Sequence, residues 1–146
     1  MSKNTSRRRV LALNSRYTWL DKNGARRVCF YCGDPADSVD HCPALAVAYA
    51  WGTENLLNSG VSLLLIPSCR ECNLLLGDRP VLTPAARGEF LNKKLSDRYK
   101  KFLGGTFNEK DLTEYGVNLR SVLERHMNIK TWIERRLHFT SRFYQI

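Results

Sequence analysis

The chain has 146 residues, of which 43% are hydrophobic, 25% charged and 10% aromatic, a balance that predicts a compact domain with a core of its own. No run of apolar residues approaches the roughly 20 that a bilayer-spanning helix needs, so we expect neither a membrane span nor a membrane partner. The net charge is +9, and a small domain this basic usually binds an anionic partner, most commonly nucleic acid.

The charge is spread unevenly and divides the chain into three parts. Residues 1–28 carry a net charge of +7, residues 29–80 carry −4 and residues 81–146 carry +6. We therefore expect a basic N-terminal arm, a central domain and a basic C-terminal region that packs on it. Basic flanks suit phosphate and an acidic centre suits a cation, although a basic helix face can equally be a solvated surface.

The arm contains three consecutive arginines, Arg7, Arg8 and Arg9, followed by a short apolar stretch that ends at Leu13. This stretch is too short for the apolar region of an export signal, so we expect a cytoplasmic protein. The arginines are then available to neutralise phosphates along a duplex.

Four of the five cysteines form two Cys-x-x-Cys pairs, Cys29 with Cys32 and Cys69 with Cys72. Two residues between cysteines let both thiolates face one point, and two such pairs supply the four sulfurs of a tetrahedral structural zinc site. Such a site has no open coordination position, so the metal would stabilise the fold rather than catalyse. Disulfides and unpaired thiols are the alternatives, and an odd number of cysteines in a cytoplasmic chain argues against disulfides. Cys42 lies outside the pairs and is expected to be a small buried residue.

The segment that joins the two cysteine pairs predicts two strands, and a short helix follows it. Residues 38–43 and the apolar run 61–67 are expected to form the strands. The second cysteine pair then opens a helix over residues 70–76, which Gly77 ends.

The connection between the two strands is long for a hairpin. Its alanine-rich start, residues 44–51, predicts two helical turns. Tyr49 and Trp51 lie in these turns, and we expect them to cover the small zinc core. The alternative is that they stack on an unpaired base of the substrate.

Beyond Pro80 the apolar residues recur at helical spacing. The pattern predicts helices over residues 83–103, 108–115 and 118–139, of which the third packs back on the first. Six basic residues on and just after the third helix are expected to form a surface that follows phosphates: Arg120, Arg125, Lys130, Arg135, Arg136 and Arg142.

Three motifs follow one another in the central part of the chain: Cys-x-x-Cys-Gly at 29–33, Asp-His-x-Pro at 40–43 and Pro-x-Cys-x-x-Cys-Asn at 67–73. In this order they resemble the motifs of the HNH endonucleases of the zinc-stapled ββα-metal type. The resemblance spans residues 29–77. It implies an α+β fold with a ββα-metal core around a CxxC/CxxC structural zinc, followed by a mainly helical C-terminal part.

The resemblance also implies a metal-dependent endonuclease that hydrolyses phosphodiester bonds in DNA. His41 would be the general base that deprotonates a water, and histidine is the side chain whose ordinary pKa lies near neutral pH. Asp40 and Asn73, the latter in place of the family's last histidine, would hold one divalent cation. Their oxygen atoms favour Mg²⁺ or Mn²⁺, a Lewis acid for the phosphate, over a second zinc. Neighbouring strand residues face opposite sides, so Asp40 and His41 can share a site only at a bend or strand end, which Pro43 would provide.

Two positions depart from the family pattern. Leu64 stands where the family has a central asparagine that ties the loop bearing the base, and Leu76 stands where a basic residue often follows the last motif. Resolvase-like members of the superfamily also lack the central asparagine. The alternative is therefore a catalytically degenerate, zinc-stabilised nucleic-acid-binding protein, and a third reading is an adaptor whose basic surface binds an acidic protein.

The basic residues expected to contact nucleic acid come from all three parts of the chain. They are Arg7, Arg8, Arg9, Arg70, Arg79, Lys93, Lys94, Lys100 and Lys101. DNA is the expected partner, and the sequence is also compatible with a homo-oligomer.

Overall fold

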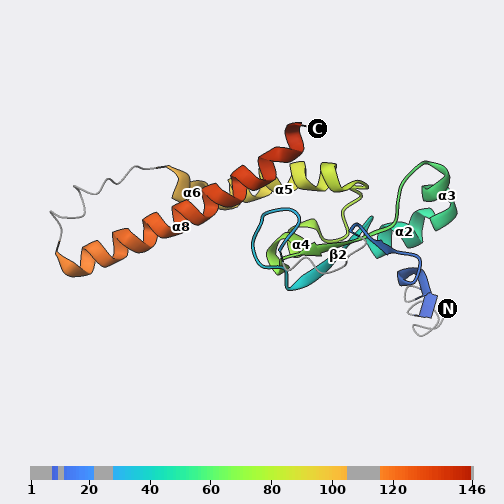
Figure 1. Cartoon of the computed structure of the whole chain (residues 1–146). Coiled ribbons are helices and arrows are strands. Elements are labelled where there is room, and N and C mark those ends of the chain that lie inside the picture. Colours follow the sequence, from blue (N-terminus) through green and yellow to red (C-terminus); the bar gives the residue numbers. More distant parts are fainter. Residues whose placement is uncertain (1–7, 10–11, 22–27, 105–115, 146) are drawn as a thin grey trace.

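The computed structural model describes residues 8–9, 12–21, 28–104 and 116–145, which form a mixed α+β fold around a small sheet (Figure 1). Its centre is an antiparallel hairpin of β2 (Ser38–Cys42) and β3 (Leu64–Ser68), followed directly by α4 (Arg70–Leu76). These are the two strands and the helix that the sequence predicts, with β3 beginning at Leu64 rather than at residue 61.

The start and the end of α4 follow from its sequence. Cys69 is the N-cap residue, and its Sγ accepts a hydrogen bond from the Cys72 amide (3.4 Å). Gly77 ends the helix with φ +49, a left-handed backbone that favours glycine. The second cysteine pair and the first turn of α4 are thus one local structure.

A third strand comes from the N-terminal part of the chain. Strand β1 (Thr18–Trp19) pairs parallel with β3, which gives the sheet order β1-β3-β2. Tyr17, just before β1, is buried, and its hydroxyl donates to the Pro43 carbonyl (2.6 Å). The sequence predicted no strand here, because so short a strand has almost no periodicity of its own.

Helices α2 (Leu45–Trp51) and α3 (Thr53–Asn58) connect β2 to β3 along the chain. They form one end of the molecule (Figure 1). The helical turns predicted over residues 44–51 are confirmed. The prediction that Tyr49 and Trp51 cover the zinc core is wrong, because these side chains are 44% and 50% exposed. Helix α2 instead packs through Ala48 on a separate apolar cluster.

The C-terminal region is helical, and its last long helix packs beside its first, as predicted (Figure 1). The predicted cap is present, since Thr83 Oγ1 accepts from the Ala86 amide (3.2 Å). The predicted first helix is broken at Tyr99, and the helix predicted over residues 108–115 lies outside the described residues. None of the helices in the described parts of the chain is long and apolar enough to cross a bilayer. The elements are α5 (Pro84–Arg98), α6 (Lys100–Leu103), α8 (Val117–Ser141) and the 3-10 helix η1 (Arg142–Gln145).

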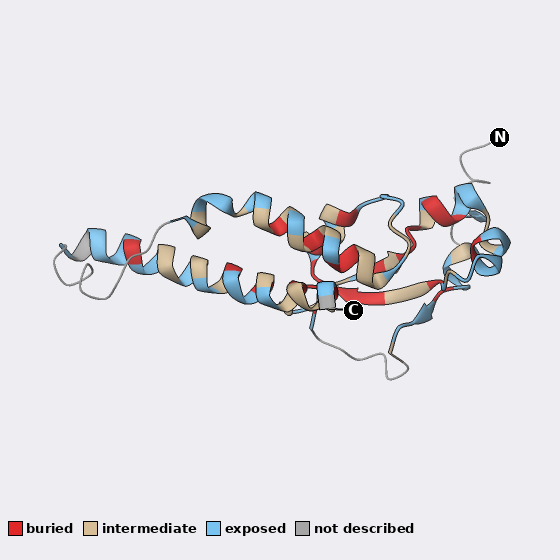
Figure 2. Ribbon diagram, turned by 90° about the horizontal axis from the view of Figure 1, so that it is seen from above, coloured by how far each residue is buried: buried red, intermediate tan, exposed pale blue. Residues whose placement is uncertain are grey.

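Two groups of buried residues hold these elements together, and Figure 2 colours the buried residues red along the helices and the hairpin. The larger group joins the paired cysteines to Ile66, Leu91 and Phe143, and therefore to β3, α5 and η1. At Gly88 an added Cβ would lie 2.1 Å from the ring of Phe143. Only glycine lets η1 approach α5 so closely, and this contact helps to seat α8 against the cysteines.

Candidate functional site

Two tight turns bring four cysteines together. The first knuckle, residues 29–33, lies before β2, and the second knuckle, residues 69–72, lies after β3. The sulfur atoms of Cys29, Cys32, Cys69 and Cys72 all lie within 4.8 Å of one another, and the four side chains are buried. Gly33, with φ +80, turns the first knuckle so that its amide donates to the Cys29 carbonyl (3.0 Å). The clustering predicted from the spacing is confirmed. The cluster could hold a metal such as zinc, and it is the only group of this kind among the residues that the structure describes.

The four sulfurs lie so close together that their ionisation is coupled. Hydrogen bonds with Cys29, Cys32 and Cys69 raise the pKa of Cys72 far above that of an ordinary thiol, whereas hydrogen bonds from Cys32 and the other two cysteines lower the pKa of Cys29. Without a cation, the four sulfurs therefore cannot all be thiolates at once. A divalent cation with an affinity for sulfur allows all four to be thiolates, so the donor set fits zinc.

Cys42 does not belong to this cluster. Its thiol donates to the Leu82 carbonyl (3.5 Å), and burial raises its pKa to about 12. Cys42 therefore stays protonated and acts as a small buried residue, as predicted.

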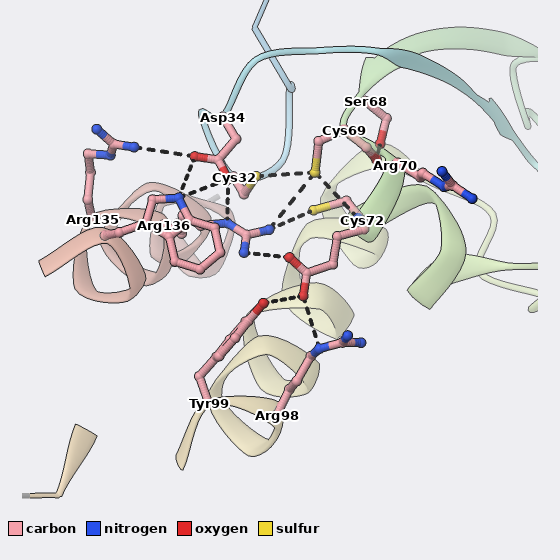
Figure 3. A network of polar contacts seen from close by, with 12 residues as sticks. Cys32, Asp34, Ser68, Cys69, Arg70, Cys72, Arg98, Tyr99, Arg135 and Arg136 are labelled. Atoms are coloured by element: carbon pink, nitrogen blue, oxygen red, sulfur yellow. Dashed lines mark hydrogen bonds and ion pairs between the residues drawn. The ribbon is translucent and has the colours of Figure 1, made fainter. Parts of the chain in front are cut away.

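Two basic residues predicted to follow phosphates pack against other parts of the fold, one of them buried and the other half-buried. Arg136 is 1% exposed and forms ion pairs with Asp34 and Glu71 beside the cysteines (Figure 3). The Arg142 guanidinium lies over the rings of Phe30 and Phe139, at 4.9 and 4.2 Å from their centroids, and donates to the Phe30 carbonyl. The prediction is wrong for Arg136, because the face of α8 that carries it packs on the core.

A separate cavity of about 260 Å³ lies at β2 and α4. Asp40, His41 and Asn73, which the sequence predicts as one site, all contribute to its lining. The cavity is completed by Val39, Ala44, Leu45, Leu74, Gly77 and Asp78.

Asn73 fastens the first turn of α4 to β2. Its Nδ2 donates to Ser38 Oγ (3.2 Å) and to the Val39 carbonyl (3.3 Å). Because both of these contacts use the amide nitrogen, the carbonyl oxygen Oδ1 is the atom left for a ligand.

His41 is held by two residues that precede the central motifs. Its Nε2 lies 2.6 Å from Asn14 Oδ1, and its ring packs edge-on against Tyr17 at 5.0 Å. An amide oxygen only accepts, so Nε2 carries the proton and Nδ1 the lone pair. Burial lowers the pKa of His41 below 6.5, an effect that the Asp40 charge opposes and the Arg87 charge reinforces. The ring is therefore neutral at pH 7. No motif marks Asn14, because it lies outside the region that resembles the family.

Asp40 is engaged in a buried ion pair that the sequence did not predict. Its Oδ1 accepts from Arg87 Nη2 (2.8 Å), and its Oδ2 accepts from Arg87 Nε (3.0 Å) and from the Tyr31 hydroxyl (2.6 Å). Burial alone would lower the pKa of Arg87, but hydrogen bonds with Asp40 raise it above its ordinary value, so the guanidinium stays charged. The role of Asp40 as a cation ligand stays a prediction, and the cation would have to share the carboxylate with Arg87.

Most of the basic residues predicted to contact nucleic acid lie on the surface, and Arg7 lies outside the described residues. Arg79 and Lys94 both lie over the ring of Phe90, at 4.9 and 5.6 Å from its centroid. Both cations are therefore stabilised by cation–π interactions with this ring. Lys94 is half-buried, and the exposed members are Arg8, Arg9, Arg70, Arg79, Lys93, Lys100 and Lys101.

Comparison with known proteins gives no match. No family model matches the chain, and no curated protein and no solved structure matches it.

The cysteine cluster predicts a clear difference between two single substitutions. Cys69→Ser removes one of the four sulfurs, so we expect the metal content to fall from about one ion per chain to near none, with a large loss of thermal stability. Cys42→Ala is the matched control, since it removes a buried sulfur outside the cluster and should leave the metal in place. Elemental analysis with thermal unfolding measures both effects. Equal metal contents in the two variants would contradict the assignment of the cluster.

The Asp40–Arg87 ion pair predicts a large stability effect. Asp40→Ala leaves a buried arginine without its counter-charge and should lower the free energy of unfolding by about 3 kcal/mol or more. Glu54→Ala removes the partner of Arg16 in an ion pair whose side chains are 44% and 72% exposed, and should cost less than about 1 kcal/mol. Urea unfolding of the metal-loaded variants tests the difference, and similar losses would show that the Asp40 pair is not buried in solution.

Proposed function

We propose that this protein is a metal-dependent endonuclease of the HNH type that hydrolyses phosphodiester bonds in DNA. The observation that carries the proposal is the cavity at β2 and α4, which Asp40, His41 and Asn73 line together. A carboxylate, an imidazole and an amide oxygen are the groups that metal-assisted hydrolysis of a phosphodiester requires. The four-cysteine cluster would hold a structural zinc that fixes α4 and the hairpin relative to each other.

His41 is suited to act as the general base. Its ring is neutral at pH 7, and the contact with Asn14 places the proton on Nε2, so Nδ1 can take a proton from water. Asn14 is a positioning residue in this scheme, because it fixes the tautomer and the orientation of the ring. Asn14 would thus fix the base from the N-terminal part of the chain. The family's central asparagine would do this from β3, where Leu64 has no polar group to do so.

Asn73 Oδ1 and Asp40 would hold Mg²⁺ or Mn²⁺, which supplies Lewis-acid stabilisation of the charge that develops on the phosphate. Asn73 is prepared for this role by its two hydrogen bonds to β2, which fix the direction of the amide. Two protein ligands bind a cation weakly until phosphate oxygens complete its shell, so we expect the cation to bind mainly with the substrate.

The basic surface supports DNA as the partner. Arg70 lies on the same helix as Asn73, and Arg79 follows the end of that helix. Both are exposed and therefore available to phosphates on either side of a scissile bond. The arm arginines and the lysines of α5 and α6 would extend this contact along the backbone, which makes the binding dependent on salt.

One observation favours a second function, a zinc-stabilised protein that binds nucleic acid without cutting it. The buried pair with Arg87 already compensates the charge of Asp40, and a guanidinium beside a cation site repels the cation. In this second function the cavity keeps its shape but holds no catalytic metal, and the basic surface acts by occupancy.

Substitution of His41 separates the two functions. His41→Ala should slow the nicking of supercoiled plasmid in Mg²⁺ or Mn²⁺ by roughly 10²–10⁴-fold. It should leave DNA affinity in EDTA nearly unchanged, because the neutral ring adds no charge. His138→Ala is the control, since His138 is an exposed histidine on α8, and it should cut like the wild type. A wild-type protein that binds DNA with a steep salt dependence but does not nick it in either metal would establish the binding function instead.

The role of Asn14 predicts a change in pH dependence. Asn14→Ala should lower the single-turnover rate at every pH, because the ring loses its fixed tautomer. Asn14→Asp keeps the acceptor but places an anion on the ring, which raises the pKa of His41 and shifts the rate profile to higher pH. Ser15→Ala serves as the control, since its hydroxyl bonds the Ala12 carbonyl (2.7 Å) and not the ring. Superimposable profiles for the Asp variant and the wild type would remove Asn14 from the site.

A further inference from the structure

Arg136 directs its three guanidinium nitrogens at different groups around the cysteine cluster (Figure 3). Nε lies 3.1 Å from Asp34 Oδ2, and Nη1 donates to Glu71 Oε2 (2.6 Å). Nη2 lies 3.9 Å from the sulfurs of both Cys69 and Cys72. Asp34 follows the first knuckle and Glu71 lies within the second, so one side chain of α8 contacts both halves of the cluster.

The two carboxylates alone do not explain this arrangement. Asp34 also accepts from Trp132 Nε1 (3.0 Å) and pairs with Arg135 (3.3 Å). Glu71 likewise has partners on α5 and just after it: Arg98 at 3.1 Å and the Tyr99 hydroxyl at 2.5 Å. Both carboxylates would therefore remain paired without Arg136, whereas the two sulfurs would lose their contact with a positive charge.

The charge of a metal-loaded cluster explains the remaining contact. Four thiolates around one divalent cation leave two negative charges uncompensated, and a buried charge is costly without a partner. An N–H group of a guanidinium binds a thiolate more strongly than a neutral thiol. Arg136, which is 1% exposed, is the buried cation that faces these sulfurs.

We propose that Arg136 is the counter-charge of the metal-loaded cysteine cluster, and that metal binding and the seating of α8 on the knuckles are therefore coupled. The coupling is reciprocal: if the loaded cluster holds α8 more tightly, then a seated α8 retains the metal more tightly. This inference rests on the proposed metal site and is independent of DNA cleavage. The C-terminal basic helix is therefore held on the core more tightly when the metal is bound.

Arg136→Met and Arg135→Met form a matched pair of variants. Both remove a cation that pairs with Asp34, but the Arg135 side chain is 68% exposed, and its contact is with the carboxylate. In the zinc-loaded protein, Arg136→Met should release metal to a chromophoric chelator about 10–100-fold faster than the wild type. Arg135→Met should release it at a rate near that of the wild type.

Two further readouts separate the sulfur contact from a general loss of stability. With Co²⁺ in place of zinc, loss of the N–H···S contacts in Arg136→Met should move the thiolate-to-metal absorption to longer wavelength, and Arg135→Met should leave it in place. Amide hydrogen exchange of the loaded Arg136→Met protein should rise in α8 and remain slow in β2 and β3. If Arg136→Met is insoluble, Arg136→Gln, which lacks the charge, takes its place with the same expectations.

The outcomes distinguish the failure of this inference from the failure of the metal site. A wild-type protein that binds no metal overturns both. A metal-loaded wild type with equal release rates in the two variants, or with an unchanged cobalt spectrum in the Arg136 variant, overturns the inference alone. Faster release, a shifted spectrum and exposed α8 amides, all confined to the Arg136 variant, establish the coupling.

Discussion

Four thiols that lie within 4.8 Å of one another in a buried volume need a cation before all four can be charged, and the rest of the structure is arranged around this constraint. The first cysteine pair precedes β2 and the second caps α4, so the cluster sets where the helix begins relative to the hairpin. Asn73 follows Cys72 directly, and its two hydrogen bonds to β2 span the same junction. The position of the amide in the candidate active site is therefore a consequence of the position of the sulfurs.

The features that the sequence predicted correctly are those set by local spacing. Two residues between cysteines, a glycine at the end of α4 and a Thr-Pro pair at the start of α5 act within a single turn of chain, and all appear as expected. The features it missed depend on partners far away in the sequence. Arg87 reaches Asp40, and Asn14 reaches His41, through contacts that no periodicity encodes. An arginine on a helix looks solvent-exposed in a sequence unless its buried anions are known, which is why Arg136 was assigned to the surface.

The buried Asp40–Arg87 pair is the feature that bears most directly on the proposed cleavage. A carboxylate with 3% exposure gains its stability from the guanidinium and the Tyr31 hydroxyl, and replacement of those partners by a cation would leave Arg87 uncompensated. A cation can nevertheless share the carboxylate, because the hydrogen bonds with Arg87 and Tyr31 leave one lone pair on Oδ1. Phosphate oxygens would then supply the remaining ligands and part of the negative charge that both cations need. Cation binding should therefore depend on the nucleic acid far more than on the protein alone.

The same pair also affects the histidine. Asp40 and His41 are adjacent residues of β2, and both contribute to the lining of the cavity. An uncompensated carboxylate next to the ring would stabilise the imidazolium and remove the lone pair that a general base needs. Burial keeps the pKa of His41 below 6.5 against the Asp40 charge, and the Arg87 charge adds a smaller lowering. The Arg87 side chain thus has two opposite consequences: it competes with a cation for Asp40, and it helps burial to keep His41 in the neutral form that can accept a proton. A catalytic role for the site requires that His41 stay neutral when a cation shares Asp40. A second positive charge near the ring would favour the neutral form further, because any nearby cation disfavours the imidazolium.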